Sequence, residues 1–318
     1  ICFLSADKKV EFHNGLFIQN WNNITDEATS DATTVITDAN FVTLQQFLAQ
    51  QKIHYFEQSI QKQGKVFSLR ANIFEDKSFE IILSDITKQE KTKQLKQEMT
   101  GNIAHELRTP ITSIRGYLET VLNQPLDNEK KHYFIEKAFK QTLVLSEITQ
   151  DMGLIAKMEE APDLFVLEIV NIEQLLQKIK EDAKVQLDAK HIDMNWQLPI
   201  HLKLKGNGNL LYALFKNLTE NVLRYAGENI KININIYNED ADFYYFSFYD
   251  TGVGVKDENH LNRIFERFYR INEGRTRDTG GSGLGLSIVK NAILFHKGKI
   301  TAKNRKEGGL EFLFTLKK

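Results

Sequence analysis

The fold is decided by the stretch Met99–Leu122, MTGNIAHELRTPITSIRGYLETVL. Its apolar residues recur at steps of three and four, the spacing of an amphipathic helix with one apolar stripe: Ile103, Leu107, Ile111, Ile114, Leu118 and Val121. At about 100° per residue, His105 lies roughly 200° around the helix from Ile103 and faces away from the stripe. Pro110 cannot donate to the carbonyl of Glu106, which frees the helix to bend just beyond the histidine.

The neighbouring segments extend this helix and add a second one. The charged segment Ile86–Met99 contains no Gly or Pro and predicts one helix that continues into the stretch above. Asn123–Pro125 interrupt it, and a second periodic segment runs from Asn128 to Met158. Two antiparallel helices with one apolar stripe each cannot enclose a core. We therefore expect two copies to pair as a four-helix bundle, which makes the protein a homodimer.

Composition restricts the class of protein. The 318 residues allow two or three domains. The near balance of 41 basic and 42 acidic residues gives no indication of nucleic acid as a partner. The one cysteine, Cys2, excludes an internal disulfide and fits a reducing compartment. No apolar run approaches the roughly 18 residues of a membrane span, and because the sequence starts at Ile1 we expect it to be a piece of a longer protein.

The two ends of the chain predict two further domains. Residues 1–86 mix alternating runs with a helical middle, as in a small α+β domain. Beyond Pro162, helical and strand patterns alternate; Asn171 is expected to cap a helix that reaches Leu187, and a second helix opens after Asn209 and ends at Gly227. Strands follow at 230–236 and 241–250, and a hairpin at 298–316, which predicts an α/β sandwich with helices on one side of a largely antiparallel sheet.

The overall expectation is a multi-domain α+β protein. Its parts are a front domain at 1–86, a helical hairpin at 87–160 and the α/β sandwich at 161–318.

Four segments of the last domain carry residues that packing alone does not require. Asn217 and Asn221 are spaced i, i+4 and project from one helix face, where carboxamide oxygens suit Mg²⁺; taken alone, they are better explained as two polar surface residues. Asp250 ends a strand and can offer its carboxylate to an amino group of a ligand. Gly252 and Gly254, which follow it, allow the backbone to approach that ligand closely.

The third segment, RIFERFYRI, offers Arg267 and Arg270 to phosphates, although an amphipathic helix explains it equally well. In the fourth, DTGGSGLGLSIVKNAI, four glycines lead into an apolar helix and predict a phosphate cradle of backbone N–H groups: Gly280, Gly281, Gly283 and Gly285. Its spacing is neither that of a dinucleotide-binding fingerprint nor that of a Walker A loop.

The order of these motifs along the chain resembles that of the sensor histidine kinases of two-component signalling. HELRTP is similar to their H box, NLTENVLRYAG to the N box, DTGVG to the G1 box, FERF to the F box and GSGLGL to the G2 box. The resemblance covers about the last 230 residues. It implies a dimerisation and phosphotransfer hairpin followed by an ATP-binding catalytic domain of the type shared with gyrase and chaperone ATPases.

The resemblance also implies roles for individual residues. His105 takes the γ-phosphoryl group of ATP, Glu106 acts as the general base, and Thr109 positions the water that hydrolyses a phosphorylated partner. Asn221 resembles the Mg²⁺ ligand, and the other nucleotide contacts follow from the motifs: Asn217, Arg224, Tyr225, Asp250, Gly252, Gly254, Arg270, Gly281, Gly283, Leu284, Gly285 and Leu286. The segment Ile271–Ser282 is expected to act as a lid over ATP.

The phosphoryl group is then expected to pass to an aspartate of a response regulator, which makes that protein the partner besides a second copy of this chain. The parent protein is expected to be anchored in a bacterial inner membrane, with this chain as its cytoplasmic portion. Two other functions stay open from the sequence. One is a phosphatase or phosphotransfer scaffold, for which Thr109 matters more than Asn221; the other is a non-catalytic dimeric ligand sensor, against which the intact glycine motifs argue.

The front domain resembles a PAS domain less specifically. The support is the order of strands and helix and the ending Ser84–Thr87, SDIT. No cysteine is placed for flavin photochemistry and no haem-ligand pattern is present, so Trp21 and the phenylalanines are interpreted as core. The stimulus, any ligand of this domain, the cognate regulator and the choice between cis and trans phosphorylation are left open.

Overall fold

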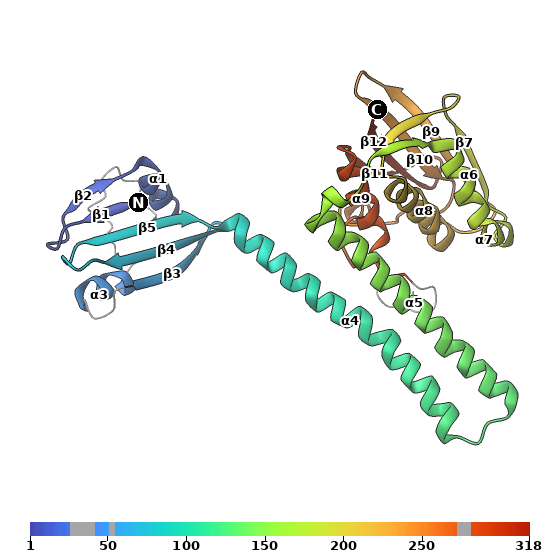
Figure 1. The fold of residues 1–318 in the computed structure, drawn as a ribbon, viewed down its shortest axis with the longest axis horizontal. Coiled ribbons are helices and arrows are strands. Elements are labelled where there is room, and N and C mark those ends of the chain that lie inside the picture. The colour runs from blue at the N-terminus through green and yellow to red at the C-terminus, as the bar shows by residue number, and fades with distance from the viewer. Residues whose placement is uncertain (26–41, 51–54, 272–280) are drawn as a thin grey trace. The chain divides into compact units, whose positions relative to one another are not determined.

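The computed structural model describes residues 1–25, 42–50, 55–271 and 281–318. These residues form two compact units, Ile1–Gly101 and Asn102–Lys318. The long helix α4 (Thr87–Asn123) contributes to both (Figure 1). Residues 26–41, 51–54 and 272–280 lie outside the described residues, and the last of these ranges holds Gly280 and most of the expected lid.

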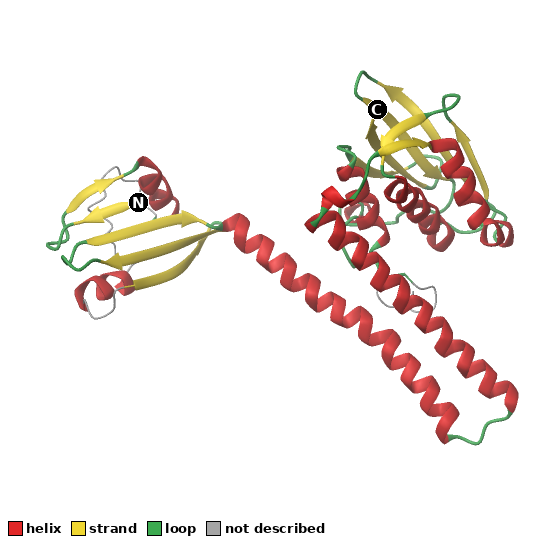
Figure 2. Cartoon of the chain, viewed as in Figure 1, coloured by secondary structure: helices red, strands yellow, loops and turns green. Residues whose placement is uncertain are grey.

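The first unit is built on a five-stranded antiparallel sheet. Its strands lie in the order β2-β1-β5-β4-β3, and their bounds are β1 (Cys2–Leu4), β2 (Val10–His13), β3 (Tyr55–Lys62), β4 (Lys65–Ile73) and β5 (Phe79–Asp85). Two helices, α1 (Gly15–Ile24) and α3 (Val42–Gln50), accompany the sheet (Figure 2). Trp21 and Phe17 are buried and stack at 5.9 Å between ring centroids, which confirms Trp21 as a core residue.

Strand β3 and helix α1 were not among the expected elements. β3 alternates only between exposed and half-buried positions, because it is an edge strand, so the hydrophobic pattern of YFEQSIQK is weak. Helix α1 begins after Asn14, whose Oδ1 accepts a hydrogen bond from the Phe17 N–H at 2.9 Å.

The second unit begins with a helical hairpin. α4 continues through Pro110 without interruption and ends at Asn123, and α5 (Asn128–Glu160) returns antiparallel to it. Asp127 caps α5 by accepting from the Lys130 N–H at 2.8 Å. The rings of Tyr117 and Phe134 meet at 6.1 Å between centroids and fix the register of the two helices.

A short 3-10 helix, η2 (Pro162–Leu164), leads into the α/β sandwich. Its main sheet has the order β11-β12-β10-β9-β7, in which only β7 is parallel to its neighbour; the strands are β7 (Asp193–Gln197), β9 (Lys231–Glu239), β10 (Phe243–Asp250), β11 (Ile300–Asn304) and β12 (Leu310–Lys317). A separate pair, β6 (Glu168–Asn171) and β8 (Lys203–Gly206), is antiparallel.

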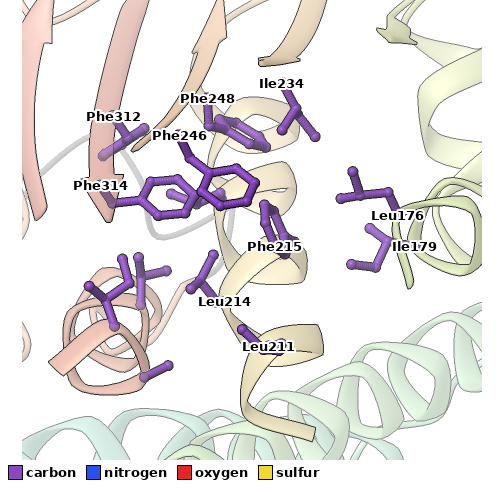
Figure 3. Packing of buried hydrophobic residues seen from close by; sticks show 14 of the residues in the cluster. Leu176, Ile179, Leu211, Leu214, Phe215, Ile234, Phe246, Phe248, Phe312 and Phe314 are labelled. Carbon is purple, nitrogen blue, oxygen red and sulfur yellow. The ribbon is translucent and has the colours of Figure 1, made fainter. Parts of the chain in front are cut away.

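Helices cover one side of the main sheet, as the sequence predicted (Figure 1). They are α6 (Ile172–Asp182), α7 (Lys184–Ala189), α8 (Gly208–Tyr225) and α9 (Gly285–Phe295). Between helices and sheet, Phe215 of α8 contacts Phe246 of β10 and Phe314 of β12, with centroids 5.9–6.1 Å apart (Figure 3). This aromatic layer holds α8, and with it the candidate site, against the sheet.

Two helix boundaries differ from expectation. The helix predicted from Asn171 to Leu187 is broken at Ala183 into α6 and α7, and the break lets Leu187 join the core beside Leu176 and Ile179. The N-cap of α8 is Asn207 rather than Asn209, because the extended Asn207 accepts from the Leu210 N–H at 3.1 Å. Asn171 caps α6, and Gly227 follows α8 with a positive φ of 108°, both as predicted.

Candidate active site

His105 lies on α4 with its side chain 69% exposed. Its Nδ1 is 3.5 Å from Oε1 of Glu106, which leaves Nε2 facing away from that carboxylate. The Thr109 hydroxyl donates to the His105 carbonyl at 3.4 Å, so the two residues share one helix face. Pro110 is buried, whereas the imidazole is presented to solvent. This is the geometry that a nucleophilic imidazole needs.

Helix α8 presents the two asparagines on the face opposite its buried leucines. Asn217 Nδ2 donates to the Ala213 carbonyl at 2.8 Å, and its Oδ1 points toward Gly285, where an added Cβ would lie 2.6 Å from that oxygen. Asn221 is one turn further along and half-buried. The structure therefore brings the N-box face of α8 against the start of α9.

The glycine-rich loop packs closely on α8 and on the F-box segment. A Cβ on Gly281 would lie 3.1 Å from Arg224 Nη1 and 3.2 Å from Tyr225 Oη, and a Cβ on Gly283 would lie 2.8 Å from the backbone of Phe268. Gly283 has a positive φ of 68°, a conformation that other residues rarely adopt. Leu284 is fully buried and the half-buried Leu286 packs on the same core, so the loop is tied down at its α9 end.

Asp250 ends β10 as a buried carboxylate. It is 2% exposed, and Oδ1 accepts from the Gly252 N–H at 2.7 Å while Oδ2 accepts from the Leu310 N–H at 3.3 Å. Burial raises the pKa of this carboxyl above its ordinary value, against the lowering effect of those hydrogen bonds. A Cβ on Gly252 would lie 2.1 Å from the Ala226 carbonyl oxygen, so no larger residue fits there.

The F-box segment joins these groups. Phe265 and Phe268 pack against the main core, and Phe268 N–H donates to the Gly283 carbonyl at 2.9 Å. Gly254 (φ 64°) faces Asn304, whose Oδ1 accepts from the Val255 N–H at 2.9 Å. Arg270 is half-buried at the end of this segment, next to the undescribed residues.

Several residues around the site were not found by sequence reasoning. Glu147 of α5 accepts from Arg224 Nη2 at 3.1 Å, and Asp151 of α5 accepts from the Ser282 hydroxyl at 3.2 Å. Burial, with the charge of Glu147 and a smaller effect of Glu220, raises the pKa of Asp151 to about 6, while the Ser282 hydrogen bond and the Lys216 charge act in the opposite direction. These contacts join residues about 80 to 130 positions apart, and no local sequence pattern indicates them.

The donor set fits a nucleotide and Mg²⁺. Asn oxygens are neutral ligands that Mg²⁺ accepts alongside phosphate oxygens and water. Among the described residues no group of His, Cys, Asp and Glu could hold a metal by itself. The glycine loop leads directly into the N-terminus of α9, where backbone N–H groups suit phosphate binding.

Comparisons with known proteins agree with this site. Residues 95–161 match the family model described as His Kinase A (phospho-acceptor) domain. Residues 206–318 match the model described as histidine kinase-, DNA gyrase B-, and HSP90-like ATPase. The two domain types and their order define the class: a phospho-acceptor domain followed by an ATPase-type domain.

Two of the curated relatives are named as a sensor protein and a sensor histidine kinase. The chain is 32% identical over 221 residues to the phosphate regulon sensor protein PhoR of Pseudomonas aeruginosa, covering 69% of this chain and 49% of that protein. It is 29% identical over 238 residues to the sensor histidine kinase WalK of Bacillus subtilis, covering 74% of this chain and 39% of that protein. The chain thus spans about half or less of the length of these relatives.

Solved structures share the fold. The histidine kinase ThkA, solved in complex with the response regulator protein TrrA, superposes with a TM-score of 0.55 at 21% identity, covering 100% of this chain and 95% of that one. Acinetobacter baumannii histidine kinase AdeS gives a TM-score of 0.54 at 22% identity, covering 67% of this chain and 97% of that one. The chain belongs to the sensor histidine kinases.

No family model covers the front domain, so its likeness to PAS domains stays a prediction. In the described part of the chain, no helix combines the length and the apolar character needed to cross a bilayer.

Proposed function

We propose that this chain uses ATP to phosphorylate His105 and then passes the phosphoryl group to an aspartate of a response regulator. The observation that carries the proposal is the exposed imidazole of His105, with Glu106 at Nδ1, in the same compact unit as a glycine loop built against Asn217 of α8. A histidine that is merely a polar surface residue needs neither the Glu106 carboxylate nor the glycine loop. The membership in the sensor histidine kinases supports the same reaction.

The phosphoryl transfer runs from ATP to the imidazole. The Nε2 lone pair of neutral His105 attacks the γ-phosphorus, the bond from that phosphorus to the β–γ bridging oxygen breaks, and ADP leaves with that electron pair. The Nδ1 proton, which becomes acidic as Nε2 is phosphorylated, passes toward the carboxylate of Glu106. Positioning and charge neutralisation supply most of the catalysis.

Each part of the nucleotide has a matching group in the catalytic domain. Asp250 is the acceptor for the adenine amino group, with Gly252 and Gly254 giving the base room, and Tyr225, 46% exposed, offers a ring to stack on. The phosphates are held by Arg224, Arg270 and the glycine loop, whose described members are Gly281, Gly283, Leu284, Gly285 and Leu286. Asn221, with Asn217 beside it, would hold Mg²⁺, which when bound neutralises the charge of the phosphates.

The chain works as a homodimer in this proposal. Apolar side chains of the hairpin are exposed in a single chain, and pairing two hairpins would bury them: Ile111, Leu118, Tyr133, Ile135, Phe139 and Leu143. The partition into a sensor domain (1–86), a phosphotransfer hairpin (87–160) and a catalytic domain (161–318) belongs to the same proposal. The five-stranded antiparallel order of the front sheet supports a PAS-like sensor.

Phosphatase activity toward the phosphorylated regulator is the second candidate. Thr109 favours this activity, because the residue is exposed and lies one turn from His105. Its hydroxyl donates to the His105 carbonyl at 3.4 Å. A hydroxyl in that place can hold the attacking water. A Thr109→Ala variant that keeps autophosphorylation but loses hydrolysis of the phosphorylated regulator would support this role.

The test of the kinase uses γ-labelled ATP with Mg²⁺. Wild type and a His132→Ala control are expected to take up acid-labile, base-stable label, and His105→Ala to take up none. His132 is a matched control because it is an exposed histidine of the same hairpin. Label that persists in the His105→Ala variant contradicts the proposal, as does absence of label from a wild-type sample that binds ATP.

A further inference from the structure

The C-terminal half of α5 carries acidic residues that contact the catalytic domain beside the nucleotide site. Glu147 accepts from Arg224 at 3.1 Å, Asp151 accepts from Ser282 at 3.2 Å, and Glu159 forms an ion pair with Arg267 of the F box. Residues 147, 151 and 159 are spaced by four and eight, so they lie along one side of the helix. All of these residues lie within the unit Asn102–Lys318.

Apolar contacts accompany these ion pairs. Ile155 is fully buried and Met158 nearly so, and both belong to the same core cluster as Ile288 and Ala292 of α9. The polar and apolar contacts together dock the C-terminal half of α5 on the catalytic domain.

The groups that α5 holds are the groups that phosphates would use. Arg224 Nη1 lies 3.1 Å from where a Cβ of Gly281 would be, and Ser282 is part of the glycine loop itself. A bound triphosphate would bring three or four negative charges toward Glu147, Asp151 and Glu220. Like charges at such separations repel strongly when partly buried, and they would compete for the same guanidinium.

We propose that docking of α5 and binding of nucleotide oppose each other. In the nucleotide-free chain Glu147 and Glu159 hold Arg224 and Arg267, and the phosphates of ATP displace these carboxylates and loosen the catalytic domain from α5. The inference rests on the proposed function, because it takes ATP as the ligand of this site. Linkage requires that the effect be reciprocal: loosening the docking tightens the binding of nucleotide by the same factor.

The position of the latch formed by Glu147 and Glu159 suits this role. The Tyr117–Phe134 contact sets the register of the hairpin. His105 lies 12 residues before Tyr117 on α4, and Ser146 lies 12 residues after Phe134 on α5. Antiparallel helices have the same rise, so Glu147 lies at about the level of His105 along the hairpin. A catalytic domain freed from α5 therefore starts near the histidine that it has to reach.

The double variant Glu147→Gln with Glu159→Gln removes both charges without changing side-chain size. It is expected to bind a non-hydrolysable ATP analogue about two- to tenfold more tightly than wild type, the range for two partly exposed ion pairs. Glu136→Gln is the matched control, since Glu136 lies on the same helix and pairs only within it, with Lys140 at 2.6 Å. The control is expected to leave the affinity unchanged.

Spin labels on the full chain test the loosening itself. With Cys2 replaced by Ala, His132→Cys on α5 and Asp242→Cys at the β9–β10 turn carry the labels, both at exposed positions away from the latch. Without nucleotide we expect a narrow distance distribution, and saturating analogue with Mg²⁺ should broaden or lengthen it, as should the double variant without nucleotide. Titration calorimetry on the same samples measures the nucleotide that is bound.

The outcomes separate this inference from the proposed function. A distribution that stays unchanged while calorimetry shows bound nucleotide overturns the latch and leaves the kinase site standing. An affinity of the double variant equal to that of Glu136→Gln also overturns the latch. Absence of nucleotide binding overturns both.

Discussion

Gly252→Ala tests the account of the adenine pocket. An added Cβ would lie 2.1 Å from the Ala226 carbonyl oxygen, whereas real contacts of this kind stay above 3.0 Å, so backbone must move by nearly 1 Å. The movement also disturbs the hydrogen bond from the Val253 N–H to that oxygen at 3.2 Å. Overpacking costs about 1–3 kcal/mol and a lost hydrogen bond about 1 kcal/mol, so we expect a loss of about 2–4 kcal/mol in the free energy of unfolding.

The assay is urea unfolding followed by the fluorescence of Trp196, which packs against the catalytic core. All variants carry Trp21→Phe, so that the front domain contributes no tryptophan signal. Gly153→Ala is the matched control: it lies in α5 with nothing within 4 Å of an added Cβ, and should be neutral or stabilising by up to about 1 kcal/mol. A Gly252→Ala protein that unfolds within 0.5 kcal/mol of wild type, roughly the size of ordinary surface effects, and binds ATP normally would refute the reasoning.

Three further changes probe other parts of the site. Asn221→Ala should abolish autophosphorylation at any Mg²⁺ concentration while its unfolding free energy stays within about 0.5 kcal/mol of wild type, checked by label uptake and urea unfolding; full activity would remove Asn221 from the site. Asp250→Asn should bind ATP at least about tenfold more weakly in calorimetry, because an amide presents one acceptor oxygen in place of the two that accept from the Gly252 and Leu310 N–H groups; unchanged affinity would remove Asp250 from the site. Asp151→Asn should be more stable than wild type at pH 7.5, because the folded protein disfavours the ionised carboxylate. The folded-state pKa of about 6 lies above the ordinary 3.8, so protonation of Asp151 stabilises the fold fully below about pH 3.8. This stabilisation is lost as the pH rises through about 6. Urea unfolding of that variant between pH 4 and 8 should lack this part of the pH dependence, and a wild-type profile that Asp151→Asn leaves unchanged would contradict the pKa shift.

Sequence periodicity predicted the elements that carry a strong apolar stripe or alternate cleanly. The hairpin helices, the α8 helix and the strands β9, β10 and β12 all fall in this group, because their core residues repeat at 3.6 or 2. The elements it missed are short or lie at an edge. Strand β3 alternates only between exposed and half-buried positions, and β6 and β8 are four residues long, too short for a periodic pattern.

The motifs predicted which residue types gather at the site, and local spacing was enough for the Asn217–Asn221 pair and the glycine loop. The sequence could not predict the contacts from α5. Glu147, Asp151 and Glu159 look like ordinary surface acids of an amphipathic helix until the fold brings Arg224, Ser282 and Arg267 to them. Such contacts depend on how two domains dock, which no local pattern encodes.

The most direct test of the central claim is to locate the phosphoryl group after the chain has reacted with Mg²⁺ and ATP. Phosphorus NMR, with proton–phosphorus correlation to the imidazole ring, distinguishes phosphorylation at Nε2 from phosphorylation at Nδ1 and from phosphoesters. Because Glu106 faces Nδ1 of His105 at 3.5 Å, we predict a single phosphohistidine at Nε2 that is absent from the His105→Gln variant. Phosphorylation at Nδ1, or on a hydroxyl that survives in that variant, would contradict the account.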